Sequence, residues 1–169
     1  MTRLLTLRRI LFFGAVGLLI PTAPVTSQSP QRFRPRLEPV AETKLLMEGM
    51  NMPNFRALEG LLKTKPADDE AWTFARGQAM LIAETGNLLM LRPPRNQGQD
   101  AWMERATELR ATAARLARTA GDQDYERSRA GLGELANACN RCHQTFRVSV
   151  RIKPFTDTRA ERGTIPELP

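Results

Sequence analysis

Apolar residues recur every three or four positions through most of residues 40–148, and this spacing places them on one face of a helix. The pattern predicts helices over residues 40–63, 67–91, 99–120 and 122–148. Pro53 interrupts the first of these, and we expect it to kink the helix or to begin a second short one. No segment combines sustained strand alternation with hairpin signals. The sequence therefore predicts an all-α protein, an antiparallel four-helix bundle.

The apolar stripes of the last three helices contain many small residues. The stripes are Trp72, Ala75, Ala79, Ile82, Gly86 and Leu89; Trp102, Ala106, Leu109, Ala113, Leu116 and Ala120; and Leu132, Leu135, Cys139, Cys142 and Phe146. Two interpretations remain open for this composition. A bulky apolar cofactor could supply the missing volume between the helices, or the small side chains could let the helices approach closely.

The N-terminal segment is typical of a secretory signal peptide. Three arginines precede the uncharged run of residues 10–20, and small residues follow near Ser27. A membrane-spanning helix would need about 20 apolar residues, and this run has eleven. We therefore expect residues 1–27 to be cleaved near Ser27, the mature protein to be periplasmic, and no stable membrane insertion to remain after cleavage.

The segments that flank the predicted bundle carry little periodic apolar pattern. Residues 28–39 contain three prolines and predict an irregular leader, and residues 149–169 predict an irregular polar tail. Three of the basic residues behind the formal net charge of +7 belong to the signal segment. The others are spread along the chain without a basic block, so the composition gives no indication of nucleic-acid binding.

The two cysteines and the single histidine of the chain lie within five consecutive residues, Cys139-Asn140-Arg141-Cys142-His143. C-x-x-C-H is the attachment signature of c-type haem. Two thiols three residues apart share one face of a helical turn and can form thioethers to the two vinyl groups of the porphyrin. His143 follows at once and can bind the iron as the proximal ligand. Both cysteines fall on the apolar stripe, so one covalently bound haem c is expected inside the bundle.

Three other interpretations of the motif are weaker. A disulfide between Cys139 and Cys142 suits an oxidising compartment, but it would strain a helical turn. A thioredoxin-like redox pair belongs at a helix N-terminus after a strand, and no strand is predicted. A structural zinc site needs four ligands, whereas the motif supplies only three.

The segment GELANACNRCHQTFR, in a secreted helical chain of this length, resembles the class II c-type cytochromes, the cytochrome c′/c-556 group. The resemblance covers about residues 40–148. It implies a haem bound near the C-terminus of the last helix, with the distal face supplied by the first helix. It also places Arg147 near the proximal face of the haem, although a solvated cation at a helix end is the alternative. Family members often pair, which leaves a homodimer open.

The second axial ligand of the iron decides the function. The resemblance places Met47 where low-spin members carry a ligand methionine, whereas high-spin members have a non-ligating apolar residue there. Met50, one turn away, is the alternative ligand, and ordinary packing of Met47 is a third interpretation. Many members have an arginine for a haem propionate four residues before this position. Thr43 stands there in this chain, and Lys44 could serve instead.

Two functions follow from these alternatives. A haem with His143/Met47 ligation would carry single electrons between periplasmic redox proteins, because a methionine ligand raises the reduction potential. A five-coordinate haem would instead bind nitric oxide or carbon monoxide. A peroxidase-like enzyme would need a distal acid–base group, and the chain has no second histidine. The methionine-rich first helix favours an electron carrier that is not an enzyme.

Overall fold

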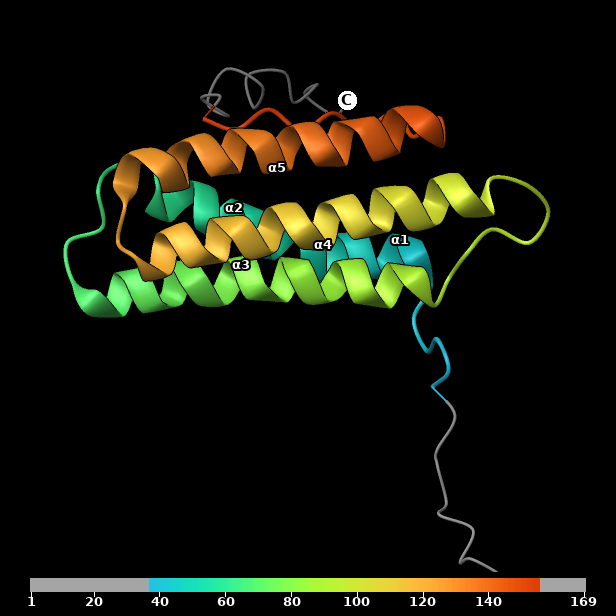
Figure 1. The fold of residues 1–169 in the computed structure, drawn as a ribbon, viewed down its shortest axis with the longest axis horizontal. Coiled ribbons are helices and arrows are strands. Elements are labelled where there is room, and N and C mark those ends of the chain that lie inside the picture. The colour runs from blue at the N-terminus through green and yellow to red at the C-terminus, as the bar shows by residue number, and fades with distance from the viewer. Residues whose placement is uncertain (1–36, 156–169) are drawn as a thin grey trace, which may run out of the picture. The chain divides into compact units, whose positions relative to one another are not determined.

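The computed structural model describes residues 37–155. Every regular element within these residues is helical, and the helices form a four-helix bundle (Figure 1). The predicted all-α fold is therefore confirmed. None of the helices in the described part of the chain is long and apolar enough to span a membrane. The predicted signal peptide, residues 1–27, lies outside the described residues.

The first helix of the bundle consists of three consecutive pieces. They are α1 (Thr43–Leu46), the π-helical turn η1 (Met47–Asn51) and α2 (Met52–Leu61). A proline cannot donate a backbone hydrogen bond, and its ring crowds the carbonyl group four residues earlier. The wider π-helical turn accommodates Pro53, which is the second residue of α2. The predicted interruption is thus present, but it lies just before the proline and the chain stays helical through it.

The three remaining helices are α3 (Asp69–Met90), α4 (Gln99–Gly121) and α5 (Tyr125–Thr145). Two of them begin with a capping aspartate. The Asp68 carboxylate accepts a hydrogen bond from the backbone N–H of Ala71 at 2.8 Å. The Asp124 carboxylate accepts one from the N–H of Arg127 at 3.0 Å. These caps satisfy backbone donors that the first helical turn leaves unpaired, so local chemistry determines where α3 and α5 begin.

The last helix ends three residues earlier than the predicted Val148. The N–H of Val148 donates to the carbonyl of His143 at 2.8 Å, and the N–H of Arg147 donates to that of Gln144 at 3.3 Å. Arg147 itself adopts the left-handed conformation, with φ 57°. This bonding pattern is a Schellman motif, which ends a helix and turns the chain. The motif usually uses glycine, and the arginine at this position explains why the sequence did not reveal the helix end.

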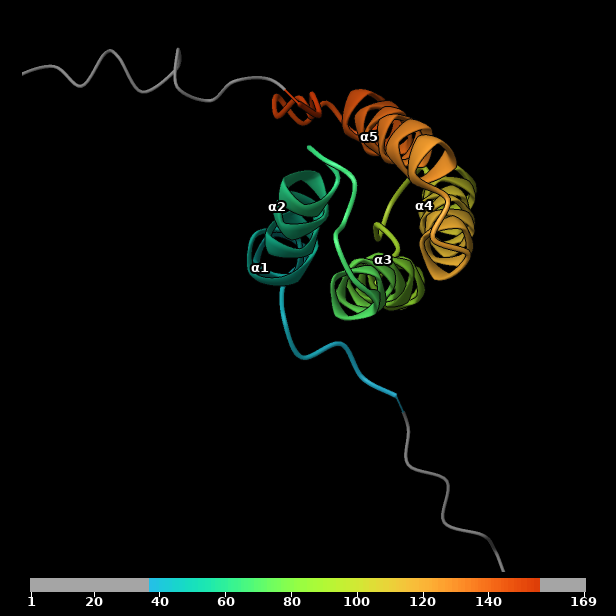
Figure 2. The ribbon, with the colours of Figure 1, turned by 90° about the vertical axis from the view of Figure 1, so that its left-hand side faces the viewer.

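The helices pack in the order expected of an up-and-down bundle. α3 lies against both α2 and α4, and α4 lies against α5 (Figure 2). At Gly86 of α3, a Cβ atom would lie only 2.9 Å from the carbonyl oxygen of Ala106 and 2.8 Å from the Cβ of Arg110. The small residues of α3 and α4 therefore serve close helix approach. None of the small residues Ala75, Ala79, Gly86, Ala106 and Ala113 lines the cavity described below.

Hydrogen bonds join the chain just after the first helix to the start of α5 at one end of the bundle. The carbonyl oxygen of Leu62, just after α2, accepts a hydrogen bond from the Arg129 guanidinium at 2.9 Å. The Tyr125 hydroxyl donates to the carbonyl of Lys63 at 3.2 Å. Toward the other end, the first half of the first helix and the second half of α5 line a common cavity. This arrangement places the C-x-x-C-H motif at that cavity.

Candidate haem-binding site

A cavity of about 550 Å³ receives residues from all four helices of the bundle and from the segment that follows α5. Its lining is mainly apolar, as expected of a site that buries a large organic cofactor. The first helix contributes Thr43, Lys44, Met47, Glu48, Asn51, Met52 and Phe55. The other helices contribute Leu89, Trp102, Arg105, Leu109, Ala138, Cys139, Cys142, His143 and Phe146, and the segment after α5 contributes Val148, Val150 and Ile152.

All three chemically reactive residues of the motif line this cavity. Cys139 is buried, and burial raises the pKa of its thiol to about 12. Burial also raises the pKa of the half-buried Cys142 thiol, although the nearby Arg105 opposes the shift. Both cysteines are free thiols rather than a disulfide. Both thiols are therefore protonated at neutral pH and lie where a porphyrin could be attached.

The structure gives no support to the zinc and thioredoxin-like interpretations. Within residues 37–155, no group of three or more His, Cys, Asp and Glu side chains is placed to hold a metal ion. The motif lies near the C-terminal end of α5 rather than at a helix N-terminus. The donor set that remains is two thiols and one imidazole beside an apolar cavity. This set fits a covalently attached haem with a histidine ligand.

His143 is held by a backbone carbonyl group. Its Nδ1 atom lies 2.9 Å from the carbonyl oxygen of Val150. A carbonyl oxygen can only accept a hydrogen bond, so Nδ1 carries the proton and donates it. In the neutral imidazole, Nε2 then keeps its lone pair and is available to a metal ion. This is the tautomer that a proximal iron ligand requires.

The first helix presents Met47 to the cavity but not Met50. All three methionines pack against the hydrophobic core, but only Met47 and Met52 are among the residues that line the cavity. The residues of the first helix that line the cavity recur in steps of four, as Thr43, Met47, Asn51 and Phe55 and as Lys44, Glu48 and Met52. Ligation of iron by Met47 is compatible with this geometry and stays a prediction.

Asn51 adds a polar group to the same wall. Its side chain is buried, with only 8% of the residue exposed. Its Oδ1 atom has no hydrogen-bond partner within the described part of the chain. A buried unpaired carbonyl oxygen costs about 1–3 kcal/mol, and an occupant of the cavity that donates a hydrogen bond to it would remove this cost. Sequence analysis did not single out Asn51.

Two cationic residues line the cavity. Lys44, which the sequence offered in place of the family's arginine, pairs with Glu48 on its own helix at 2.6 Å and is largely exposed. Arg105 of α4 is more buried, with 18% of its side chain exposed. Sequence analysis missed Arg105, although it follows Trp102 by three residues and so lies on the same helical face. Either cation could neutralise an acidic group of a bound cofactor.

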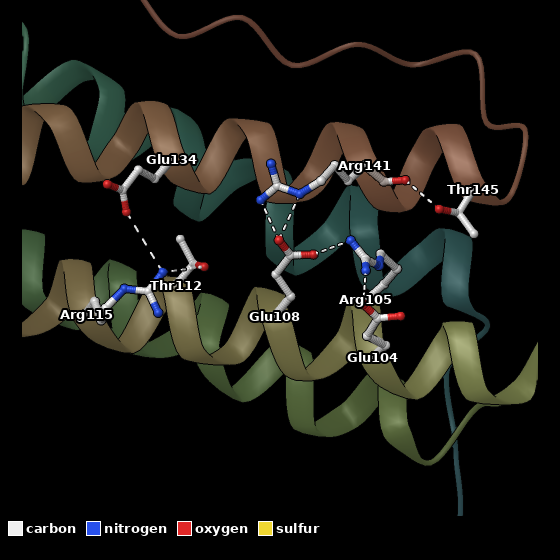
Figure 3. A network of polar contacts seen from close by, with 8 residues as sticks. All are labelled: Glu104, Arg105, Glu108, Thr112, Arg115, Glu134, Arg141 and Thr145. Atoms are coloured by element: carbon white, nitrogen blue, oxygen red, sulfur yellow. Dashed lines mark hydrogen bonds and ion pairs between the residues drawn. The ribbon is translucent and has the colours of Figure 1, made fainter.

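The motif is also tied to the neighbouring helix. The carboxylate of Glu108 on α4 accepts hydrogen bonds from Arg105 at 2.6 Å and from Nε of Arg141 at 2.8 Å (Figure 3). Arg105 also contacts the carboxylate of Glu104. Because Arg141 is the residue between the two motif positions Asn140 and Cys142, this shared carboxylate fixes the last turns of α5 against α4.

Arg147 lies apart from the cavity lining. It is exposed and occupies the left-handed position that ends α5. It is not among the residues that line the cavity. Its position near the haem, which the resemblance implies, stays a prediction.

The segment after α5 contributes residues to the site that the sequence prediction did not foresee. Residues 149–155 form no helix or strand, and the rest of the predicted irregular tail lies outside the described residues. Three residues after α5 nevertheless line the cavity, namely Val148, Val150 and Ile152. They alternate with Ser149, Arg151 and Lys153. This period of two was a signal for an extended segment with one apolar face.

Residues 96–147 match the family model described as Cytochrome C′. The matched segment contains α4, α5 and the complete C-x-x-C-H motif. No curated protein matches the chain significantly. The family match confirms the resemblance to the class II c-type cytochromes, and this family implies a covalently bound c-type haem.

Proposed function

We propose that this protein is a periplasmic one-electron carrier. The family match of residues 96–147 supports its identification as a class II c-type cytochrome. One haem c would be held by thioethers of Cys139 and Cys142, with His143 and Met47 as the axial ligands. When bound, the haem iron supplies the chemistry by exchanging one electron between its ferric and ferrous states. The observation that carries the proposal is the presence of Met47 and His143 on the walls of one cavity.

The chain's own residues give this site its electronic character. The apolar side chains that line the cavity exclude water, which strengthens electrostatic interactions within it. A thioether ligand favours the reduced iron and raises the reduction potential relative to a nitrogen ligand. Lys44 and Arg105 line the same cavity, but carboxylates of the chain already pair with both, so an acidic group of the porphyrin would have to compete with Glu48 or with Glu104 and Glu108. These features suit reversible electron transfer without a bound substrate, and we propose no enzymatic activity.

Visible spectroscopy tests the ligation directly. The holoprotein would be purified from the periplasm of a host that attaches haem, and its oxidised and reduced spectra would be compared with those of Met47→Leu. A sulfur-to-iron charge-transfer band and a narrow split reduced spectrum, both lost in Met47→Leu, are expected. Met50→Leu is the matched control, because Met50 does not line the cavity, and it should keep the wild-type spectrum. A wild-type spectrum in Met47→Leu would contradict the proposal.

A second candidate function is the binding of nitric oxide or carbon monoxide at a five-coordinate iron. The observation that favours it is the buried Asn51 amide on the cavity wall, with its Oδ1 atom unpaired. The polarity of a distal pocket influences which ligands a haem accepts. A broad high-spin spectrum of the reduced wild type, which sharpens when carbon monoxide is added, would support this candidate over electron transfer.

Export and redox partners form the remaining part of the proposal. The basic start, the short apolar run and the small residues near Ser27 support cleavage and transfer to the periplasm. N-terminal sequencing of the haem-containing protein tests this directly, and a first residue close to Ser27 is expected. An intact N-terminus in a haem-loaded protein would contradict cleavage. Periplasmic redox proteins are the partners that this location and a one-electron carrier imply.

A further inference from the structure

Residues 148–155 form an ordered segment that runs back along α5, and we refer to it as the C-terminal strap. Figure 1 shows it beside α5 after the chain turns at the helix end. The Schellman motif at Arg147 produces this reversal. The strap contains no helix or strand, so its position depends on specific contacts with the bundle.

The first anchor of the strap is a pair of reciprocal hydrogen bonds with the haem-attachment motif. The Asn140 side chain donates through Nδ2 to the carbonyl of Ile152, and its Oδ1 accepts from the N–H of Ile152, each at 2.8 Å. The side chain of Ile152 is buried. A side-chain amide that satisfies both backbone groups of one residue fixes the position and orientation of that residue.

The second anchor holds the far end of the strap to two other parts of the bundle. The N–H of Phe155 donates to the carboxylate of Glu59 on α2 at 2.6 Å. The guanidinium carbon of Arg129 on α5 lies 4.0 Å from the centre of the Phe155 ring, in a cation–π contact. The strap is therefore fixed on both the first and the last helix.

The contact with His143 lies next to the first anchor. Val150, two residues before Ile152, places its carbonyl oxygen 2.9 Å from Nδ1 of His143. Since a free chain end would not keep a carbonyl at this distance, the Asn140 anchor is what makes the contact persistent. Asn140, a residue of the motif, therefore holds the strap, and the strap in turn bonds to His143, the histidine of the same motif.

We propose that the C-terminal strap is a positioning element for the His143 ligand, with Asn140 as its key residue. This inference rests on the proposed haem site. A hydrogen bond from Nδ1–H to a carbonyl oxygen fixes the tautomer and the orientation of the imidazole ring. It also makes Nε2 a stronger electron donor to a metal ion. A stronger donor stabilises the ferric state, so the strap lowers the reduction potential relative to a protein without this bond.

The test compares Asn140→Ala with the matched control Asn137→Ala in the full-length holoprotein. Asn137 lies on the same helix, is exposed, and is not an anchor of the strap. Two properties would be measured: the exchange rate of the His143 Nδ1 proton by NMR, and the midpoint reduction potential. In Asn140→Ala, we expect the proton to exchange at least roughly tenfold faster, because two hydrogen bonds of the anchor are lost. We also expect a higher potential, whereas Asn137→Ala should match the wild type in both.

A second variant covers the case in which Asn140→Ala prevents haem attachment. Glu59→Ala removes the acceptor of the far anchor without altering the motif, and it should change both properties in the same direction by a smaller amount. Wild-type values for the folded, haem-loaded variants would overturn the inference. Each variant is compared with a wild type that has the same second axial ligand, so the differences report on the strap whether or not Met47 binds the iron. Failure of the electron-carrier proposal appears separately, in the spectrum of Met47→Leu.

Discussion

The indole ring of Trp102 and the phenyl ring of Phe146 meet edge to face, with centroids 5.1 Å apart and an interplanar angle of 72°. This contact joins the start of α4 to the end of α5 beside the cavity that both rings line. Such pairs contribute about 0.5–1.5 kcal/mol beyond the burial of their area. A double-mutant cycle of Trp102→Leu and Phe146→Leu should therefore give a coupling free energy of about 1 kcal/mol in urea unfolding. Strictly additive losses would contradict this prediction.

Gly86→Ala is expected to destabilise the bundle. The added methyl group would lie 2.8–2.9 Å from Arg110 and from the carbonyl oxygen of Ala106, so α3 and α4 would have to separate. Overpacking of this kind costs about 1–3 kcal/mol, which exceeds the gain of about 1 kcal/mol in helix propensity. Gly133→Ala in α5, where nothing lies within 4 Å of the new methyl group, is the control. The free energy of unfolding of Gly133→Ala should rise. A rise in Gly86→Ala as well would contradict the close approach of α3 and α4 at Gly86.

Asn51→Leu tests whether the cavity wall carries an unpaired polar atom in the haem-loaded protein. If Oδ1 of Asn51 has no partner, replacing the amide by an apolar side chain of similar size should raise the free energy of unfolding by about 1 kcal/mol. Asn54→Leu is the control in the same helix, because the Asn54 amide donates to the carbonyl of Met50 at 2.6 Å. That variant should gain no stability. A loss of stability in Asn51→Leu would show that the oxygen bonds to an occupant of the cavity.

Arg147→Gly separates the two interpretations of Arg147. The left-handed backbone, with φ 57°, costs a non-glycine residue about 1–2 kcal/mol, and glycine avoids this cost. Glycine also loses about 0.5–1 kcal/mol more conformational entropy on folding, which cancels part of the stabilisation. The free energy of unfolding should therefore rise by about 0.5–1 kcal/mol in Arg147→Gly but not in Arg147→Ala. A changed reduction potential in both variants would place the charge of Arg147 near the haem. An unchanged potential in both would leave it a solvated cation.

The outer face of α3 carries an apolar patch that suits self-association. Phe74, Met80 and Leu81 are 52%, 45% and 44% exposed. A homodimer, which the resemblance leaves open, would bury this face, because exposed apolar groups that gather on one helix commonly mark interfaces. Sedimentation of the holoprotein should show a dimer that Phe74→Glu and Leu81→Glu each weaken. Met103→Glu, at an exposed position on α4, should leave it intact. A monomeric wild type at all concentrations would contradict this prediction.

The helices and the haem-attachment motif could be predicted because they depend on local chemistry. The spacing of apolar residues gave the extent of α3 and α4 to within two residues, and the capping aspartates Asp68 and Asp124 lie where the sequence suggested helix starts. Helix periodicity, capping and a five-residue motif each act over a few residues, so one sequence contains all the information they need. The end of α5 was less predictable, because an arginine rather than a glycine occupies its left-handed turn.

The sequence alone was enough to predict the helices and the fold class, and its C-x-x-C-H motif predicts where a haem would be attached. The packed structure was needed to show that Met47 and Met52 line the cavity while Met50 does not, that Arg105 and Asn51 lie on its walls, and that Val150 bonds to His143. The first of these depends on which face of the first helix turns toward the cavity. The others depend on contacts between residues far apart in the chain. Such contacts form only when the helices have packed, because their geometry belongs to the whole bundle rather than to any one segment.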